Sequence, residues 1–350
     1  MVSEVFDLAV VGAGVIGLAH AYVAAKAGKR VVVVEKDARA NGASIRNFGF
    51  ITVTGQERGD SWRLARRTRD VWAQIAPQAR IPIVQRGLYL TTRSAEAVDV
   101  VEAFLATEMG EGCNLLSAGD FRTLSEGLGG PDLMGALHSP HELRVESRTA
   151  IPALAAWLEA ALGVIFHYQT VVFEAAPPKL RTSRGVIEAG AVVVCPGDDF
   201  STLYPERIAA YGLRRSRLSM LKLADPGFRP PGALMSDLSL ARYRGYAALP
   251  EARALEARLR AEQPAAFDHG VHLIVARGAD GALIVGDSHH YDLLPPPFAP
   301  AEAEQEILDE YRRAVGRAAP PVVERWTGTY AVADDRTYLV DTPQTDVRLV

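Results

Sequence analysis

The sequence predicts an α/β protein in which two structural units share one chain. The chain has 350 residues, 48% of them hydrophobic and 23% charged, which suits a globular protein with more than one compact unit. A glycine-rich segment lies between two short apolar runs near the N-terminus. Further along, strand-like runs such as 87–91 and 271–275 alternate with helical stretches, a pattern typical of an antiparallel sheet that carries helices on one face.

The first unit begins as a strand, a turn and a helix. Residues 7–11 form a short apolar run rich in β-favouring residues, as expected of a strand buried on both faces. A complete G-x-G-x-x-G pattern occupies residues 12–17, and helical composition follows over 18–27. We expect Gly28 to cap this helix and a second strand to occupy residues 30–34. This order of elements is that of a βαβ unit.

We predict that this unit is Rossmann-like and binds a dinucleotide. Gly12 permits a tight turn, Gly14 lets the backbone approach a pyrophosphate, and Gly17 lets the helix and the strand pack closely. Glu35 follows the second strand and would accept a hydrogen bond from a ribose hydroxyl, while its charge would repel a 2′-phosphate. The expected nucleotide contacts are Gly12, Gly14, Val15, Ile16, Gly17, Glu35 and Lys36.

The segment after the second strand favours FAD over a nicotinamide dinucleotide. Residues 40–50 form a loop of small and polar residues rather than another parallel crossover unit, and the sequence has no second G-x-G-x-x-G for a separate NAD(P)H domain. In FAD enzymes such a loop lines the pyrophosphate and the flavin end of the cofactor. We therefore expect Ser44, Arg46 and Asn47 to contact FAD, and the flavin to be reduced by the organic substrate itself.

The nucleotide-binding segments are separated along the chain. We predict an FAD-binding domain formed by residues 1–82, 145–213 and 322–350. An antiparallel-sheet substrate domain is predicted over 83–144 and 214–321. The architecture is thus a discontinuous two-domain one, with flavin and substrate expected at the interface.

The chain resembles the glycine oxidase and D-amino acid oxidase group of FAD-dependent oxidoreductases. The resemblance rests on the glycine fingerprint and on five further segments, which are 44–49, 170–172, 192–197, 286–290 and 325–330. It implies a D-amino acid oxidase-like fold. It also implies that the backbone at Val172 contacts the adenine and that Cys195 and Gly197 lie beside the cofactor.

Three longer motifs resemble a clade of this group that is linked to aminophosphonate breakdown. They are SIRNFGF at 44–50, RVESRTAIP at 144–152 and GDSHHYD at 286–292. The resemblance implies oxidation of an amine on a small phosphonate, such as 2-aminoethylphosphonate or its N-methyl or 1-hydroxy form. The products would be an aldehyde, ammonia or an amine, and hydrogen peroxide, with molecular oxygen as the acceptor.

Four side chains are the candidates for contact with the substrate. Arg46 would clamp the dianion through its fork of donors, although an ion pair with the pyrophosphate or a carboxylate is the alternative. His289 and His290 cannot both face the core because strand side chains alternate, and the resemblance favours His289. The resemblance also implies that Tyr330 orients the substrate, with core packing as the alternative. Arg325 is a weaker candidate for the anionic group.

The sequence departs from the family in two places. Relatives of the sarcosine oxidase type carry a flavin-linked cysteine near the position of Gly328, so FAD is expected to be non-covalent here. The chain stops at Val350 within a strand-like run, where the family continues with a glycine-rich loop and a closing helix. We therefore expect the C-terminal end of the FAD-binding domain to be truncated and FAD to be held less tightly.

Composition excludes several other classes of protein. The net charge of −4 gives no reason to expect nucleic acid as a partner, and two cysteines without metal-ligand spacing indicate a reducing cytoplasm and no metal. The apolar run 8–28 follows Glu4 and Asp7 and contains the glycine pattern, so no membrane segment is expected. The resemblance implies that the chain can form a homo-oligomer.

Two alternative functions stay open at this point. One is an FAD-dependent dehydrogenase of a 2-hydroxy acid or a polyol phosphate that passes electrons to a quinone. The other is a non-catalytic FAD-binding protein that serves assembly or sensing.

Overall fold

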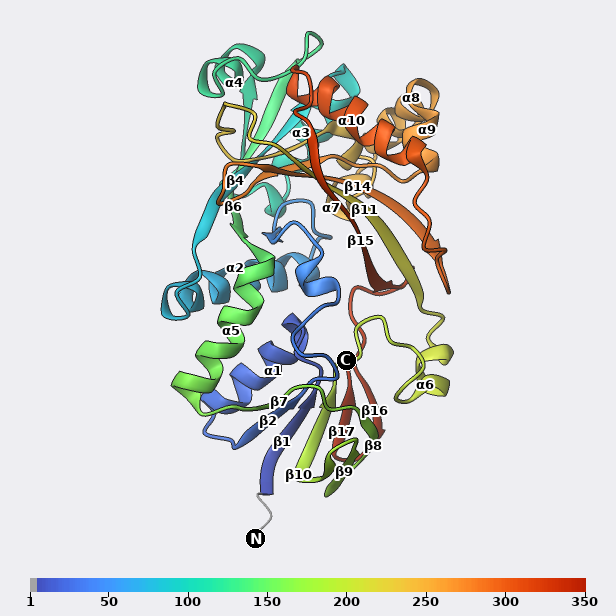
Figure 1. Cartoon of the computed structure of the whole chain (residues 1–350). Helices are drawn as coiled ribbons and strands as arrows, with labels where there is room; N and C mark the ends of the chain where they lie inside the picture. Colours follow the sequence, from blue (N-terminus) through green and yellow to red (C-terminus); the bar gives the residue numbers. More distant parts are fainter. Residues whose placement is uncertain (1–4) are drawn as a thin grey trace.

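The structure is a computed structural model that describes residues 5–350, and its two sheets lie one above the other (Figure 1). The first sheet has the strand order β16-β17-β10-β1-β2-β7, and the β8–β9 hairpin joins it through β10. Its strands from β17 to β7 are parallel, as in a Rossmann-like unit. The bounds are β1 Val5–Val11, β2 Val31–Val34, β7 Ile165–His167, β8 Val172–Ala176, β9 Lys179–Thr182, β10 Gly185–Val194, β16 Asp341–Gln344 and β17 Val347–Leu349.

The predicted βαβ unit is present with small shifts in its boundaries. Helix α1 spans Val15–Lys26, and Ala27 rather than Gly28 is its C-cap. Gly28 follows with φ +78°, a backbone conformation that glycine adopts without strain. In β2, Val31 and Val33 pack in the cluster formed with α1 and α5 (Ser147–Leu162), whereas the alternate residues face the opposite cluster. The sheet is thus buried on both faces, which explains the unbroken valine run.

The second sheet has the order β15-β11-β14-β13-β12-β4-β6-β3, with β5 paired to β6. Its strands are β3 Phe50–Ile51, β4 Ile83–Thr92, β5 Asn114–Ser117, β6 Gly135–Val145, β11 Arg214–Leu223, β12 Ala233–Met235, β13 Ile274–Arg277, β14 Leu283–Asp292 and β15 Val322–Val332. The predicted antiparallel sheet is present, with one exception. Strand β12 is parallel to β4, so the sheet is mixed.

The division of the chain also differs from the prediction. The segment 322–332 was assigned to the FAD-binding domain, yet it forms β15 and pairs with β11 along nearly its whole length. The segment 50–51 likewise pairs with β6 in the second sheet. The chain returns to the first sheet only at β16. Antiparallel pairing with β11 and β6 assigns these two segments to the second sheet, and such long-range pairing cannot be read from the composition of the segments.

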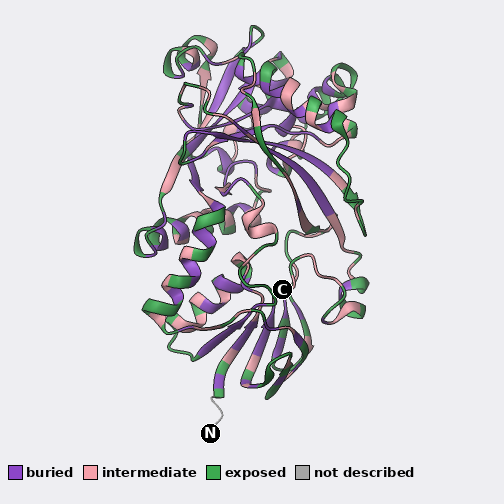
Figure 2. Cartoon of the chain, in the orientation of Figure 1, coloured by how far each residue is buried: buried purple, intermediate pink, exposed green. Residues whose placement is uncertain are grey.

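Helices surround both sheets, and the burial pattern in Figure 2 separates their inner and outer faces. The remaining helices are α2 Asp60–Gln78, α3 Ala95–Leu105, α4 Ala118–Leu124, α6 Pro205–Ala210, α7 Arg244–Ala247, α8 Ala252–Glu262, α9 Pro264–Asp268 and α10 Ala301–Val315, with 3₁₀ turns η1 Ala43–Ile45, η2 Glu108–Gly110 and η3 Asp237–Ser239. Among residues 5–350, none of the helices has both the length and the apolar character needed to cross a membrane.

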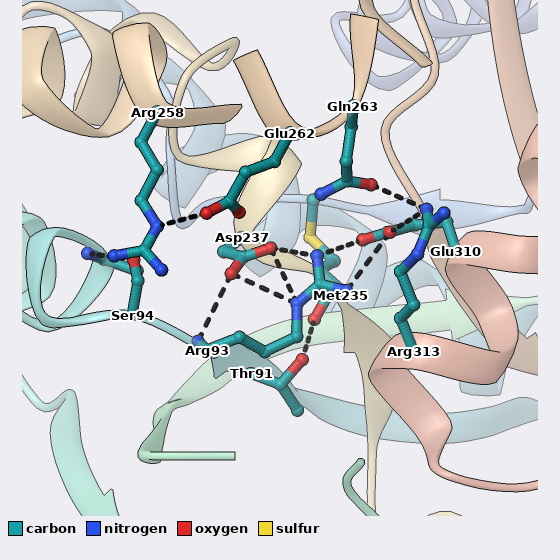
Figure 3. A network of polar contacts seen from close by, with 11 residues as sticks. Thr91, Arg93, Ser94, Met235, Asp237, Arg258, Glu262, Gln263, Glu310 and Arg313 are labelled. Atoms are coloured by element: carbon teal, nitrogen blue, oxygen red, sulfur yellow. Dashed lines mark hydrogen bonds and ion pairs between the residues drawn. The ribbon is translucent and has the colours of Figure 1, made fainter. Parts of the chain in front are cut away.

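A buried ion network fastens the helices of the second unit to its sheet (Figure 3). Arg93 follows β4, and its Nε donates to Asp237 Oδ1 of η3 at 3.1 Å. Its Nη2 donates to Glu310 Oε1 of α10 at 2.6 Å. Both carboxylates are inaccessible to solvent, so this arginine compensates charge from two separate elements.

Candidate active site

A cavity of about 620 Å³ is lined by residues of both sheets. Its wall in the first unit comprises Gly14, Val15, Ile16, Gly17, Cys195, Pro196 and Gly197. The loop between the units contributes Ala43, Ser44, Arg46, Asn47, Phe48 and Phe50. The second sheet and its connections contribute Tyr243, His272, Ile274, Asp287, His289 and the run 328–333. A volume of this size is within the range of small-molecule sites.

The glycine turn explains one end of this cavity. A Cβ on Gly12 would lie 2.5 Å from the carbonyl oxygen of Cys195, and one on Gly17 would lie 1.9 Å from the carbonyl oxygen of Gly12. Gly14 is the N-cap of α1 and has no side chain with which to cap the helix. The first turn of the helix lines the cavity. The backbone amides and the positive end of a helix dipole form an anion site here. This geometry fits a pyrophosphate.

Glu35 stands behind the turn rather than on the cavity wall. Its Oε2 accepts a hydrogen bond from the Ala13 amide at 2.8 Å, and its Oε1 accepts one from the Asp37 amide at 3.0 Å. The Glu35 carbonyl accepts from the Thr170 amide, which brings the segment before Val172 alongside. Gly12, Lys36 and Val172 also lie off the wall, and the Lys36 ammonium pairs with Asp199 at 2.9 Å. A carboxylate retains acceptor capacity for a ribose after two such bonds.

The loop 43–49 is held from two sides. The amide of Val15 donates to Ser44 Oγ at 2.9 Å, which joins the loop to the start of α1. Trp326 Nε1 donates to the Arg46 carbonyl at 3.0 Å, which joins it to β15. Asn47 is used internally, since its side-chain oxygen accepts from the Gly49 amide. Within the described part of the chain the Arg46 guanidinium has no ion-pair partner, and it lines the cavity.

The motif at 144–152 supports this loop. Arg144 is almost fully buried, and its Nε donates to the Phe48 carbonyl at 3.1 Å. Ser147 Oγ lies 3.3 Å from the carbonyl oxygens of Ile45 and Asn47. Two of the three motifs that suggested a specific clade are therefore in direct contact. The segments 44–50 and 144–152 thus form one structural unit.

A cluster of histidine, aspartate and tyrosine forms the opposite end of the cavity. His289 is buried and lines the wall, whereas His290 turns away toward His269 at 3.2 Å, as strand alternation requires. Asp287 lies two residues earlier on β14, next to an irregularity in the pairing with β11, and its side chain lines the same cavity. His272 faces it across the sheet, because the backbone amides and carbonyls of the two residues bond to each other at 3.3 Å.

The side chains of this cluster lie close together without direct hydrogen bonds to the carboxylate. The distances to Asp287 oxygens are 3.6 Å from His272 Nε2 and 3.7 Å from His289 Nε2. The Tyr243 hydroxyl lies 3.2 Å from His272 Nε2. Burial raises the pKa of Asp287 to about 7 and lowers the pKa of both imidazoles. Burial also raises the pKa of Tyr330, on the adjoining part of the wall, to about 12.

The sequence interpretation missed three members of this cluster and misplaced one candidate. His272, Asp287 and Tyr243 come from a loop, a strand and a helix cap, and of these only Asp287 could have been indicated, by its spacing from His289. The assignment of Arg325 to the anionic group is wrong. Its guanidinium is exposed and makes two hydrogen bonds of 2.7 Å to Glu304 of α10, away from the cavity.

No strong nucleophile stands on the described cavity wall. Gly328 lines it and has no side chain, and Cys195 lines it with a thiol whose pKa burial raises to about 12. The residues present thus fit a dinucleotide held by backbone amides and loops.

Comparison with known proteins agrees with this geometry. The family described as FAD dependent oxidoreductase matches residues 7–350. Glycine oxidase of Geobacillus kaustophilus is 29% identical over 206 residues, which cover 55% of this chain and 54% of that protein. The chain thus aligns with only about half the length of this curated relative.

Two solved structures share the fold. The crystal structure of glycine oxidase from Geobacillus kaustophilus has a TM-score of 0.78 at 20% identity and covers 99% of this chain and 89% of its own. L-proline dehydrogenase from P. horikoshii has a TM-score of 0.77 at 16% identity and covers 99% and 88%. The family match extends over nearly the whole chain, and it shows that this protein belongs to the FAD dependent oxidoreductase family.

Proposed function

We propose that the protein oxidises a small primary or secondary amine with FAD, by oxidative deamination or N-dealkylation. One observation carries the proposal: a single cavity joins the glycine turn at its one end to a polar wall on the second sheet at the other. When bound, FAD would take a hydride from the amine-bearing carbon of the substrate, and molecular oxygen would then regenerate it with release of hydrogen peroxide. The family membership and the likeness to glycine oxidase support this reaction class.

The residues of the chain would position the two reactants. The amides of the first turn of α1, together with Ser44 and Asn47, would hold the pyrophosphate end, and Glu35 the ribose. His289 and Tyr330 face the cavity from neighbouring regions of the second sheet and would orient the amine over the flavin. The apolar lining from Phe48, Leu218 and Ile274 would exclude water from the reacting carbon.

We propose an aminophosphonate as the substrate class, because of Arg46. Its guanidinium is half-buried, lines the cavity and lacks an ion-pair partner among residues 5–350. A planar fork of donors suits an anion with several oxygens, and a dianionic phosphonate gains more from it than a neutral amine does. 2-Aminoethylphosphonate and its N-methyl and 1-hydroxy forms are the compounds to test.

The reaction class can be tested by anaerobic reduction of the bound flavin. Each phosphonate above, and glycine and sarcosine for comparison, is added to the oxygen-free holoprotein, and the visible absorbance of oxidised flavin is followed. We expect bleaching by at least one amine and peroxide release on admission of air. Absence of bleaching by every amine would contradict the proposal and favour a non-catalytic role. Reduction of a quinone dye without oxygen uptake would favour a dehydrogenase instead.

The substrate class can be tested by Arg46→Ala. We expect KM for phosphonates to rise about 10- to 100-fold, since charge-assisted hydrogen bonds contribute roughly 1.5–3 kcal/mol. KM for neutral amines should change little, and Arg46→Lys should recover part of the phosphonate binding. An equal rise in KM for phosphonates and neutral amines would remove Arg46 from the clamp.

The mode of flavin attachment has a simple test. Because neither Gly328 nor the high-pKa thiol of Cys195 offers a ready nucleophile, we propose that FAD is non-covalent. After acid precipitation, the flavin should remain in the supernatant. Flavin that stays with the precipitated chain would contradict this.

A further inference from the structure

The cluster of His272, Asp287 and His289 has the composition and spacing of a metal site. Each residue offers one donor atom, and the three atoms lie within 4.8 Å of one another. All three side chains are buried. Donors around one ion at about 2.0–2.2 Å are separated by roughly 3.4 Å in a tetrahedral arrangement. The observed 3.6 Å from His272 Nε2 to Oδ1 of Asp287 and 3.7 Å from His289 Nε2 to Oδ2 are near that value and too long for hydrogen bonds.

The carboxylate in this cluster lacks the partners that a buried charge needs. Oδ1 of Asp287 is inaccessible and makes no hydrogen bond to any residue that the structure describes. The nearby guanidinium of Arg242 donates to the Tyr291 hydroxyl instead and forms no ion pair with Asp287 in the described chain. The positive charge of Arg242 acts on this carboxylate only from beyond ion-pair distance. A buried carboxylate without a hydrogen bond or an ion pair costs several kcal/mol, so its site favours a bound cation.

The histidine tautomers suit metal binding as well. His289 Nδ1 lies 3.0 Å from the Gly270 carbonyl and donates to it, which leaves Nε2 as a lone-pair donor that faces Asp287. Metal-binding histidines commonly use their second nitrogen in this way, because the outer hydrogen bond fixes the ring and the tautomer. The His289 donor atom is thus oriented in advance by the Gly270 carbonyl, whereas Nδ1 of His272 is buried without a hydrogen-bond partner among the described residues.

We propose that His272, Asp287 and His289 bind a divalent transition-metal ion, Zn²⁺ by their donor chemistry, at the wall of the cavity. Two imidazoles and one carboxylate form a three-ligand set that leaves a fourth position open. That position faces the cavity, since all three residues line it. This site rests on the side chains alone and does not depend on the proposed amine oxidation.

The Tyr243 hydroxyl would lie next to the open fourth coordination position of the proposed Zn²⁺ site. It lies 3.2 Å from His272 Nε2 and lines the same cavity. On metal binding it would give up this hydrogen bond and donate to the fourth ligand, a water or an anionic oxygen. No metal was expected from the sequence, because residues 15 and 17 positions apart in different elements come together only in the fold.

The test is the metal content and affinity of the full-length flavoprotein. The protein is freed of metal by a chelator, incubated with Zn²⁺, desalted and analysed by elemental mass spectrometry. We expect one Zn²⁺ per chain in the unchanged protein. Substitution by Co²⁺ should produce the visible d–d absorption of a low-coordinate site with nitrogen and oxygen ligands. Less than a tenth of an equivalent of Zn²⁺ in the unchanged protein would overturn the proposal.

Matched variants locate the ion. His289→Gln and Asp287→Asn should each weaken Zn²⁺ binding more than tenfold. His290→Gln, one position along the strand and directed to the other face, should keep the full equivalent. Tyr243→Phe should bind at least as tightly, because it removes a competing hydrogen bond. Circular dichroism and bound flavin check the fold of each variant. Equal loss of Zn²⁺ in the His289 and His290 variants would contradict the assignment.

Discussion

At the scale of single residues, the glycines of the nucleotide-binding turn are fixed by contacts of different kinds. Gly12 has φ +105°, and a Cβ there would also strike the Cys195 carbonyl. Gly17 is in ordinary helical conformation but touches the backbone of Gly12. A Cβ on Gly14 would lie 3.1 Å from Ser44 Oγ, so this hydroxyl would have to shift by a few tenths of an ångström. Each glycine of the fingerprint therefore packs against a different neighbour.

The first prediction concerns Gly17. Gly17→Ala places a methyl group 1.9 Å from a backbone oxygen, so the helix must move away from the turn. We expect FAD affinity to fall at least tenfold, measured by quenching of flavin fluorescence. Gly42→Ala is the matched control, because a Cβ there meets no atom within 4 Å and φ is not positive. If both variants bind FAD like the parent, close packing at residue 17 is not needed for the site.

At the scale of secondary-structure elements, ion pairs join segments that are distant in sequence. Arg207 of α6 makes two hydrogen bonds of 2.6 Å to Asp341 at the start of β16. Arg93 joins the end of β4 to η3 and α10 (Figure 3). These two pairs differ in burial, since the Arg207 side chain is half exposed while Arg93 is largely buried. Their energetic roles should therefore differ.

The second prediction concerns acid stability. Hydrogen bonds from Arg207 hold the pKa of Asp341 at about 2, below its ordinary value of 3.8. A lowered folded-state pKa stabilises the fold above about pH 4, and this contribution is lost as the pH falls toward 2. We expect Asp341→Asn to lower Tm by a few degrees at pH 6, and this deficit to narrow at pH 3. Asp346→Asn, exposed on the same hairpin, should show no such change. A deficit that is constant with pH would exclude the carboxylate as its cause.

The third prediction concerns the buried network. Arg93→Met leaves Asp237 and Glu310 without their shared cation, and breaking a buried pair in this way costs about 3–5 kcal/mol. Urea unfolding should show this loss. Arg258→Met is the control, because Arg258 pairs with Glu96 and Glu262 at the surface, and we expect little change. If the two variants unfold alike, the network contributes no more than a surface pair.

At the scale of the whole molecule, the cavity is shared by both units. The turn at 12–17 closes one end, and strands β14 and β15 of the second sheet form the other (Figure 1). A ligand that contacts both walls stabilises the arrangement of the two units as well as each unit alone. Flavin binding should thus stabilise segments of the second unit that lie far from the glycine turn.

The fourth prediction tests this coupling. Added to flavin-free protein at about 100 times its Kd, FAD should stabilise the fold by roughly 2.7 kcal/mol and raise Tm by several degrees. Hydrogen exchange read by mass spectrometry should slow in peptides from 10–17 and also in peptides from 284–292. Helix α8 (252–262), which contributes no residue to the cavity wall, serves as a reference that should exchange unchanged. Protection confined to the first unit would mean that the ligand does not reach the second wall.

The sequence by itself determined the βαβ unit, the dinucleotide fingerprint and the family. These are local patterns, because a strand, a turn and a helix that follow one another along the chain form one binding element. The alternation of His289 and His290 was predictable for the same reason, since a strand reverses its side chains at each residue. The loop at 40–50 was predicted from its small and polar residues, although its support by Arg144 was not.

Only the tertiary structure decided which elements share a sheet and which side chains meet. β15 belongs to the second sheet because it pairs with β11, about a hundred residues earlier in the chain. Arg325 is removed from the site by its pair with Glu304. His272 and Asp287 meet because two segments run antiparallel there, and Tyr243 joins them from a helix cap. Such contacts depend on strand pairing and burial between distant segments. They are determined by the free energy of the whole fold and cannot be read from any one segment.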